Sequence, residues 1–255
     1  MSGFYIGVDG KARKVKGAYV GVDGIARKMK KGYVGVNGVA RLCWNSIDPV
    51  FANNSWEDIA IACQNGVVPD SWAVGDQKTM TIGGVDYTID IIGKNHDDYS
   101  DGGGKAPLTF QIHDCYETKY SIHSNMVSAI AWKDTTMRNT HLPNIMAVMP
   151  SEVQRAIKTV NKTSYGGVTS DTLFLLSERE IFGTESFSST TNEGTQYEYY
   201  TNGGSKIKKI DEIANYWWER SKAGVGNSYC LISDKGAPSY ATIVSTYGVS
   251  FAFCF

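Results

Sequence analysis

Three groups of side chains in this sequence have the residue types that catalysis or metal binding requires. The first is the segment 94–104, where Asp97, Asp98 and Asp101 lie beside glycines. Carboxylates in a Gly-rich loop can bind Ca²⁺, but the spacing differs from that of an EF-hand loop, which also needs a distal bidentate Glu. We therefore expect a flexible polar loop here, with Ca²⁺ binding as the alternative.

The second group is the dipeptide His113-Asp114, which could form part of a catalytic dyad. No GxSxG motif and no activated cysteine accompanies it, so the nucleophile that a dyad would serve is missing. We expect structural or surface roles for this histidine and for His96, His123 and His141. The sequence thus predicts a chain that is not an enzyme and has no catalytic residue, metal site or cofactor.

The third group is the five cysteines, Cys43, Cys63, Cys115, Cys230 and Cys254. They are far apart and form neither a CxxC motif nor a Cys/His pair at zinc spacing, and their odd number leaves at least one free thiol. We expect buried, reduced residues in a protein made in the cytoplasm. A disulfide between Cys230 and Cys254 is the alternative.

Composition and charge limit the classes of protein that remain. The chain has 255 residues, of which 42% are hydrophobic and 20% charged, with a net charge of −1. This is typical of a globular chain with one large or two small domains, and it favours neither a nucleic-acid nor a membrane partner. No apolar run reaches the length of a membrane span, and no leader peptide is recognisable. Nine basic and two acidic residues lie within 1–44, so a basic arm precedes an acidic body.

That arm is an internal repeat of fourteen residues, with units that start at Tyr5, Tyr19 and Tyr33. Each unit has two strand-like segments around Asp-Gly or Asn-Gly, the strongest short-range signal for a β-hairpin. A single hairpin is marginally stable in water, so these units must pack on each other or on a partner. We expect residues 1–46 to form a stem for attachment or for assembly into a homotrimer. A solvated basic linker is the alternative.

Residues 47–255 are expected to form one α+β domain with two or three helices and a mixed or antiparallel sheet. A helix should follow the N-cap Ser55 and end near Gly66. Further helices are expected within 124–134 and, capped by Ser151, within 150–160. Strands are expected at 79–82, 85–92, 107–112 and 172–176, and a long loop at 184–204.

The C-terminal forty residues carry the most distinctive pattern. Trp217 and Trp218 adjoin on a strand and must point to opposite faces, and Arg220 beside them needs a carboxylate or carbonyl partner. A hairpin should follow, with strands 228–233 and 237–244 and Gly236 in the left-handed region. The apolar ending Phe251-Ala252-Phe253-Cys254-Phe255 predicts a central, buried strand.

Between these fixed ends, residues 222–247 are rich in small, polar and Tyr side chains, as adaptable binding surfaces are. We therefore expect this segment to form the ligand face. The predicted ligand-binding residues are Lys222, Asn227, Tyr229, Asp234, Ser239, Tyr240, Thr242, Ser245 and Tyr247.

The motif Trp217-Trp218-Glu219-Arg220-Ser221 and the ending that starts at Gly248-Val249 resemble a family of prophage-borne tail proteins of Gram-positive gut bacteria. The likeness extends upstream through 173–183, 87–93 and 72–76, and covers about residues 47–255. It implies a C-type-lectin-like fold, like that of the variable proteins of diversity-generating retroelements, and binding without chemistry. It also implies a place in the virion tail after synthesis in the bacterial host cytoplasm.

Taken together, these features predict a phage tail adhesin that binds a host cell-surface protein or glycan and contacts other tail proteins through residues 1–46. Two alternatives remain. A structural virion protein would explain the repeats but leave the C-terminal surface unused. A glycan hydrolase would need two carboxylates about 5 to 9.5 Å apart in a cleft.

Overall fold

The computed structural model describes residues 5–14, 18–22, 24–29, 31–45 and 47–255. The chain divides into two compact units, Met1–Trp72 and Ala73–Phe255. The boundary lies further along the chain than the expected one at residue 47, because Trp72 packs with Asp48 and Phe51 of the first unit. Its indole N–H donates to the carbonyl of Asp48 at 3.0 Å, and its ring lies 5.4 Å from that of Phe51.

Three two-stranded hairpins make up the repeats of the first unit, as the sequence predicts. Their strands are β1 (Tyr5–Val8) with β2 (Lys11–Lys14), β3 (Tyr19–Val22) with β4 (Ile25–Lys28), and β5 (Lys31–Val36) with β6 (Val39–Asn45). In the first turn Asp9 and Gly10 have φ of 52° and 72°, and in the third Asn37 and Gly38 have φ of 51° and 77°. Asn, Asp and Gly tolerate these left-handed values, which explains the turn sequences.

The hairpins leave large apolar side chains in solvent. Tyr19, Ile25, Tyr33 and Val39 are 64%, 60%, 58% and 57% exposed. Each hairpin is a single two-stranded layer, and no second layer covers these side chains among the described residues. They therefore lie outside a hydrophobic core.

The first unit ends with the short helix η1 (Phe51–Asn53) and the helix α1 (Trp56–Gln64). The hydroxyl of Ser55 accepts a hydrogen bond from the N–H of Asp58, so the predicted N-cap is confirmed. Gly66 follows the helix in the left-handed region, with φ of 62°.

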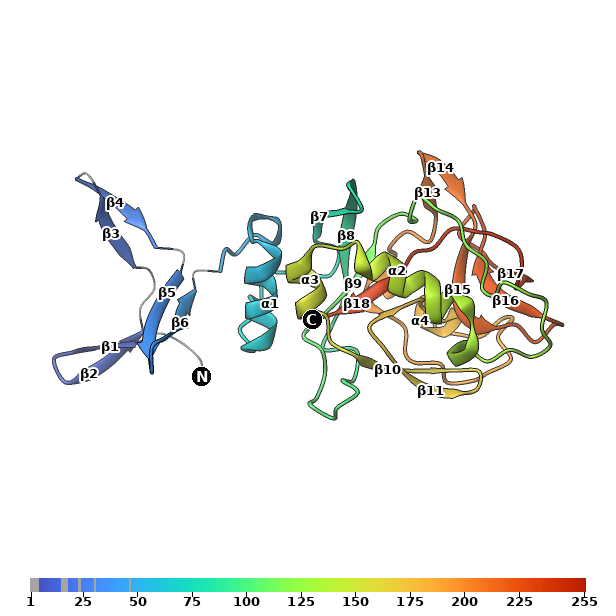
Figure 1. Cartoon of the computed structure of the whole chain (residues 1–255), viewed down its shortest axis with the longest axis horizontal. Coiled ribbons are helices and arrows are strands. Elements are labelled where there is room, and N and C mark those ends of the chain that lie inside the picture. Colours follow the sequence, from blue (N-terminus) through green and yellow to red (C-terminus); the bar gives the residue numbers. More distant parts are fainter. Residues whose placement is uncertain (1–4, 15–17, 23, 30, 46) are drawn as a thin grey trace. The chain divides into compact units, whose positions relative to one another are not determined.

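A five-stranded antiparallel sheet lies at one side of the second unit, away from β15, β16 and β17 (Figure 1). Its order is β12 (Leu173–Phe174), β18 (Ala252–Cys254), β9 (Leu108–Ile112), β8 (Val85–Lys94) and β7 (Gln77–Ile82). The predicted central position of the C-terminal strand is confirmed, because β18 pairs with β12 on one side and β9 on the other. The rings of Phe110 and Phe253 stack 5.1 Å apart across that pairing.

The second unit also contains smaller antiparallel sheets. The three-stranded sheet comprises β15 (Trp217–Lys222), β16 (Ser228–Ile232) and β17 (Pro238–Thr242). The hairpin β13 (Lys208–Ile210) and β14 (Ile213–Asn215) lies at one edge of the unit, and β10 (Val160–Ser164) with β11 (Gly167–Asp171) at the opposite edge (Figure 1). The expected turn at Gly236 is confirmed, with φ of 76°.

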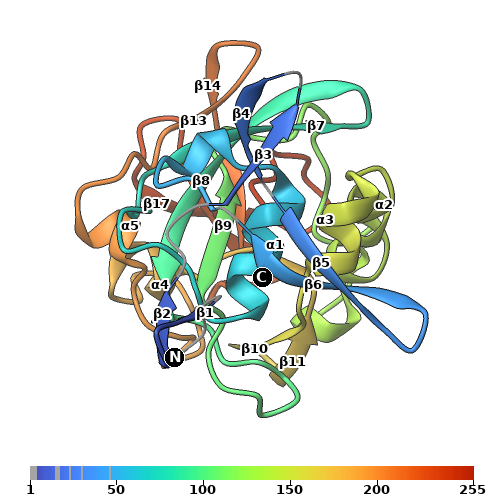
Figure 2. The same cartoon turned by 90° about the vertical axis from the view of Figure 1, so that its left-hand side faces the viewer.

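The helices of the second unit are short. They are η2 (Trp132–Asp134), the π-helical turn η3 (Met137–His141), α2 (Leu142–Ala147), α3 (Ser151–Ala156), α4 (Glu178–Phe182) and α5 (Glu198–Thr201). Figure 2 shows α2 and α3 on one flank of β8 and β9, and α4 and α5 on the other. No helix in the described part of the chain is both long and apolar enough to cross a membrane.

The expected C-type-lectin-like α+β fold is wrong. The structure is β-rich, with 36% strand against 18% helix, and it consists of several small antiparallel sheets with few helices. Much of the difference lies in the segments 124–134 and 150–160, where helices were expected. In these segments, contacts with residues far along the chain replace the local hydrogen bonds of a helix.

Residues 124–134 illustrate this. Only Trp132–Asp134 is helical, Ala129 has a φ of +53°, and the N–H of Trp132 donates to the carbonyl of Tyr165. The second expected helix is reduced to α3, where Pro150 and not Ser151 stands at the N-cap. From Val160 the chain continues as strand β10.

Candidate functional site

The predicted ligand segment lies largely on the hairpin β16–β17, which pairs with β15. Cys230 pairs with Tyr240 and Ser228 with Thr242. All six residues of β15 are buried. The hairpin is therefore supported by a strand that is packed on both faces.

The nine predicted ligand-binding residues differ in exposure. Tyr240 and Thr242 are exposed. Half-buried positions are taken by Asn227, Asp234, Ser239, Ser245 and Tyr247. Together these seven side chains can present hydroxyl, amide, carboxylate and aromatic groups to a partner.

Tyr229 and Lys222 are buried, so the expectation that they present exposed ligand contacts is wrong. Tyr229 is fully buried, and its hydroxyl donates to the carbonyl of Ile130 at 3.1 Å. Burial raises the pKa of this phenol. The Lys222 ammonium donates to the carbonyl of Ala223 at 3.0 Å. The reason is that both β15 and β16 are covered on both faces. The side chains that alternate between the two faces of each strand are therefore all buried.

Aromatic rings adjoin the exposed part of this face. Tyr240 lies 5.1 Å from Phe187, between ring centroids, and Tyr247 lies 5.7 Å from Tyr216 and 5.2 Å from the buried Trp218. Tyr216 is 38% exposed and was not among the predicted contacts. Its position immediately before Trp217 and Trp218 was the sequence signal that could have placed it at this face.

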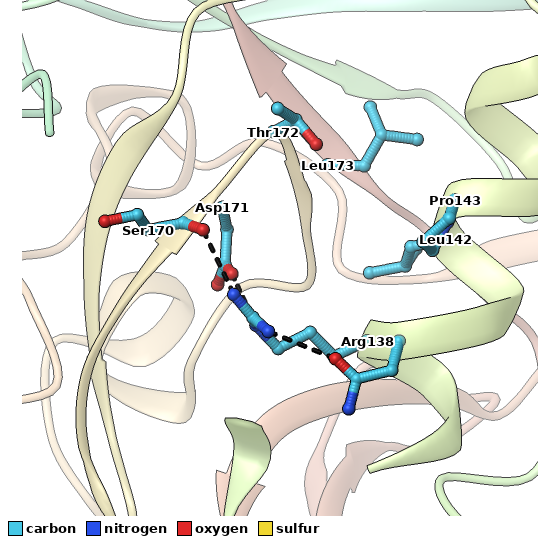
Figure 3. A pocket seen from close by; sticks show the side chains of 8 residues that line it. Arg138, Leu142, Pro143, Ser170, Asp171, Thr172 and Leu173 are labelled. Carbon is cyan, nitrogen blue, oxygen red and sulfur yellow. Dashed lines mark hydrogen bonds and ion pairs between the residues drawn. The ribbon is translucent and has the colours of Figure 1, made fainter. Parts of the chain in front are cut away.

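A small pocket lies elsewhere on the unit, between η3, α2 and the end of β11. Its volume is about 230 Å³, and its lining includes Arg138, Leu142, Pro143, Asp171 and Thr172. Figure 3 shows Arg138 reaching across to Asp171, with Nε donating to Oδ1 at 2.6 Å. Ligand pockets usually measure about 300 to 1,000 Å³. The pocket is smaller, and its guanidinium already has a carboxylate partner.

The candidate His113-Asp114 dyad does not form. His113 Nδ1 lies 2.7 Å from Oδ2 of Asp90, and the other carboxylate oxygen, Oδ1, accepts a hydrogen bond from the Gln77 amide at 2.8 Å. Asp114 instead accepts a hydrogen bond from the N–H of Lys209 at 2.8 Å. The histidine thus belongs to a polar contact between β7, β8 and the end of β9.

The segment 94–104 forms a loop after β8, as expected, but one of its three carboxylates is buried. Asp98 and Asp101 are exposed, whereas Asp97 points inward and is only 4% exposed. No group of three or more potential metal ligands occurs among the described residues. The carboxylates of this loop therefore do not converge.

The inward Asp97 belongs to a buried network of charges. Lys162 of β10 contacts Asp97, lies 3.1 Å from Glu180 of α4, and donates to the Tyr197 hydroxyl at 2.8 Å. Arg220 of β15 holds Glu180 by two hydrogen bonds, of 2.5 and 3.0 Å. The predicted need of this arginine for a carboxylate partner is confirmed.

Each charged group of the network has further partners. Glu180 completes a capping box with Ser177, whose N–H donates to Oε2 at 3.0 Å. Arg220 also donates to the carbonyls of Leu175 and Glu193 at 2.9 and 3.0 Å. Paired and hydrogen-bonded charges of this kind tolerate burial, whereas single ones do not.

The pKa values follow from this pairing. Burial alone would raise the pKa of Asp97, but the adjacent Lys162 ammonium outweighs burial and lowers it. Burial would likewise raise the pKa of Glu180, yet Arg220 and then Lys162 lower it. For Lys162, the two carboxylates outweigh burial and raise the pKa. The three groups are therefore charged at neutral pH.

A second buried acidic group lies on the other side of β15 and is only partly satisfied. Glu178 accepts from the N–H groups of Phe187 and Ser188, and Glu193 accepts from Ser221. Neither carboxyl oxygen of Glu219 has a hydrogen-bond partner among the described residues. Burial, followed by repulsion from Glu178 and Glu193, raises the pKa of Glu219 well above its ordinary value.

Residues 108–255 match the family described as a domain of unknown function (DUF6273). This match covers more than half of the chain. The chain belongs to the DUF6273 family. No curated protein and no solved structure matches it.

The DUF6273 match includes Lys162, Glu180 and Arg220, whereas Asp97 precedes it. Strands β7 and β8 also precede it, although they complete the five-stranded sheet. Sequence reasoning missed the roles of Asp97, Lys162 and Glu180. For Glu180 a signal existed, because Ser177 and Glu180 have the spacing of a capping box.

The structure describes the side chains of four of the five cysteines. Cys63, Cys115, Cys230 and Cys254 are buried and unpaired, so the alternative disulfide between Cys230 and Cys254 does not form. The side chain of Cys43 lies outside the described residues. Burial raises the pKa of the Cys63 and Cys115 thiols to about 12. Such thiols are poor nucleophiles at neutral pH.

Proposed function

We propose that this DUF6273 protein is a receptor-binding protein of a phage tail, which binds a host cell-surface protein or glycan through the exposed part of β16–β17. The observation that carries the proposal is the exposed Tyr240 and Thr242 of β17, with five half-buried polar or aromatic residues within 227–247, in a sheet whose strand β15 is fully buried. Tyrosine with short polar side chains gives large contact area at low cost in conformational entropy.

The resemblance of residues 47–255 to prophage tail proteins supplies the biological setting of this proposal. The hairpins of the first unit supply the attachment to other tail proteins and to further copies of the chain, as a homotrimer. Attachment of several copies to one particle would strengthen a weak single-site affinity.

The test is to replace Tyr240 and Thr242 together by Ala in the full chain and to measure binding to cells of the host bacterium. Exposed substitutions change the free energy of unfolding by less than about 0.5 kcal/mol. Loss of an aromatic anchor should weaken binding by about 2 kcal/mol, or some thirtyfold per site. The control is Val168→Ala on β11, which alters another exposed side chain outside the proposed face.

A folded double variant that binds cells like the parent would contradict the assignment of this face. Equal weakening by Val168→Ala would show that the loss is not specific to β16–β17.

The exposed apolar side chains of the hairpins favour a second candidate, a structural tail component. In this case the first unit carries the function by assembling copies of the chain, and β16–β17 binds nothing. Ile25→Thr with Val39→Thr keeps the preference for strand while removing apolar surface. Light scattering should then show a monomer, with Val168→Thr as the control that stays trimeric. A parent chain that is itself monomeric would exclude assembly through the hairpins.

A further inference from the structure

Lys162 is a buried amine in direct contact with a carboxyl group. The side chains of Lys162 and Asp97 are 2% and 3% exposed, and they meet in an ion pair. The ammonium nitrogen also lies 4.0 Å from the centre of the Phe174 ring. A nucleophile and an acyl carbon are thus held together where bulk water does not reach.

We propose that the Lys162 side-chain nitrogen and the Asp97 carboxyl group condense to an intramolecular isopeptide bond, which cross-links the loop after β8 to β10. Nζ attacks Cγ of Asp97, one C–O bond breaks, and a C–N bond forms. The ammonium has three hydrogens, of which one stays on the amide nitrogen and two leave with the departing oxygen as water. The ion pair and the amide plus water contain the same atoms and the same charge, so the step consumes no oxidant and no co-reactant.

Glu180 is placed to carry the proton that must first leave Nζ. Its Oε1 lies 3.1 Å from that nitrogen. Because Arg220 holds Glu180 as a carboxylate, Glu180 can accept a proton from the ammonium and pass it to Asp97, which is attacked as the neutral carboxylic acid. The second proton of the departing water comes from Nζ after the attack.

Two hydroxyl groups are placed to stabilise the negative oxygen of the tetrahedral intermediate. Tyr197 donates to the Asp97 carboxyl oxygens at 2.9 and 3.0 Å, and Thr109 donates to Oδ2 at 2.5 Å. Fixed donors at a developing oxyanion are a major source of rate in acyl transfer. The hydroxyl of the fully buried Tyr197 is held in place by Lys162 as well.

The buried setting also favours the product over the ion pair. Two charges in a water-poor interior carry a large desolvation cost, whereas an amide is neutral. The reacting groups are held in contact, which replaces a bimolecular encounter by an intramolecular one. Water, the second product, is dilute in that interior and leaves for the solvent.

The cross-link would join positions 65 residues apart in the sequence. A covalent closure of this length restricts the unfolded chain, as a disulfide does, but it cannot be reduced. It also fixes the loop in which Tyr99 forms a bridge with Val160. This inference does not depend on what β16–β17 binds.

The test is the mass of the purified full chain under denaturing conditions, followed by peptide mapping. The parent should weigh one water molecule less than its sequence, and digestion should yield a branched peptide that contains both Asp97 and Lys162. Lys162→Met should restore the full sequence mass. A chain that is folded by circular dichroism, has its full sequence mass and gives no branched peptide would overturn the proposal, whatever the variants do.

Lys208 provides a matched control for the chemistry. It is also a fully buried lysine, but it donates to the carbonyls of Ile112 and His113 and has no ion pair among the described residues. Lys208→Met should keep the loss of one water. A mass loss abolished by both lysine changes would point to dehydration elsewhere and would also contradict the proposal.

Asp97→Asn gives a second, independent readout. The amide can leave as ammonia in place of water, and the cross-linked product is then the same molecule as that of the parent. Branched peptides of identical mass from chains of different sequence mass are the expected result. A branched peptide from neither chain would exclude the bond.

Discussion

The two units of this protein treat charge and apolar surface in opposite ways. The hairpin unit leaves Tyr19, Ile25 and Tyr33 in solvent, whereas the second unit buries Arg220 and Lys162. A two-stranded hairpin is a single layer, so its faces stay open to solvent. In the second unit, by contrast, both faces of β15 are covered. The second unit is thus held by specific polar pairing as well as by apolar packing, while the hairpins of the first leave large apolar side chains uncovered.

The largest loss of stability is expected from Arg220→Met. The change removes the guanidinium that pairs with the buried Glu180, and breaking one side of a buried ion pair costs about 3 to 5 kcal/mol. Urea unfolding followed by Trp fluorescence measures the loss. The double variant Arg220→Met with Glu180→Gln removes both charges and should be less destabilised than the single one. A single variant as stable as the parent would mean that the pair contributes little.

Trp218→Ala should have an effect of similar size through packing. Trp218 is fully buried, and its indole N–H donates to the carbonyl of Tyr120 at 2.8 Å. Removing a large buried ring costs about 3 to 5 kcal/mol, because a cavity remains. Trp217 is also fully buried, so both of the opposite faces to which the two tryptophans point are core. A loss of less than 1 kcal/mol, on the order of a conservative core change, would contradict the packing seen here.

An intermediate effect is expected from the pH dependence that Glu219 imposes. Its carboxyl is neutral in the folded state, because its pKa is raised, and ionises in the unfolded chain above the ordinary value of 4.5. The folded state therefore holds more protons, and the free energy of unfolding should fall as pH rises above that value, by about 1.4 kcal/mol per pH unit for one group.

Glu219→Gln should remove this contribution and make the variant more stable than the parent at pH 7, with the two converging toward pH 4. Unfolding curves at several pH values give the comparison. Parallel pH profiles for the parent and the variant would show that Glu219 is ionised in the folded state.

The smallest effect is expected in the hairpin unit, from Tyr33→Ala. This aromatic ring is 58% exposed, so its loss should change the free energy of unfolding of the second unit by less than about 0.5 kcal/mol. Together with Trp218→Ala, this change shows the effect on stability of removing one aromatic ring in each unit. A loss above 1 kcal/mol would show that the hairpins contribute to the stability of the second unit.

The parts of the fold that the sequence predicted are those with local causes. Asp-Gly and Asn-Gly define the hairpin turns, Ser55 defines the start of α1, and Gly236 defines a left-handed turn position. Segment 124–134 has no such cause, because its backbone is fixed by contacts with residues far along the chain, such as Tyr165. The overall fold depends on many contacts of that kind, and the resemblance that suggested another fold could not supply them.

In the candidate site, too, local causes were predictable and long-range ones were not. The pairing of Arg220 was predictable because a charge beside core tryptophans must be neutralised. The burial of Tyr229 was not, since it requires knowledge that a second layer covers β16. Asp97 was grouped with exposed neighbours, and only the fold separates its side chain from those of Asp98 and Asp101.

The repeated hairpins have a consequence for how the gene can change. Each fourteen-residue unit closes on itself, since β1 pairs with β2, β3 with β4 and β5 with β6. Insertion or deletion of one repeat in the gene would therefore add or remove one whole hairpin and leave every remaining strand with its partner. The first unit can thus change in length in steps of fourteen residues, one hairpin at a time.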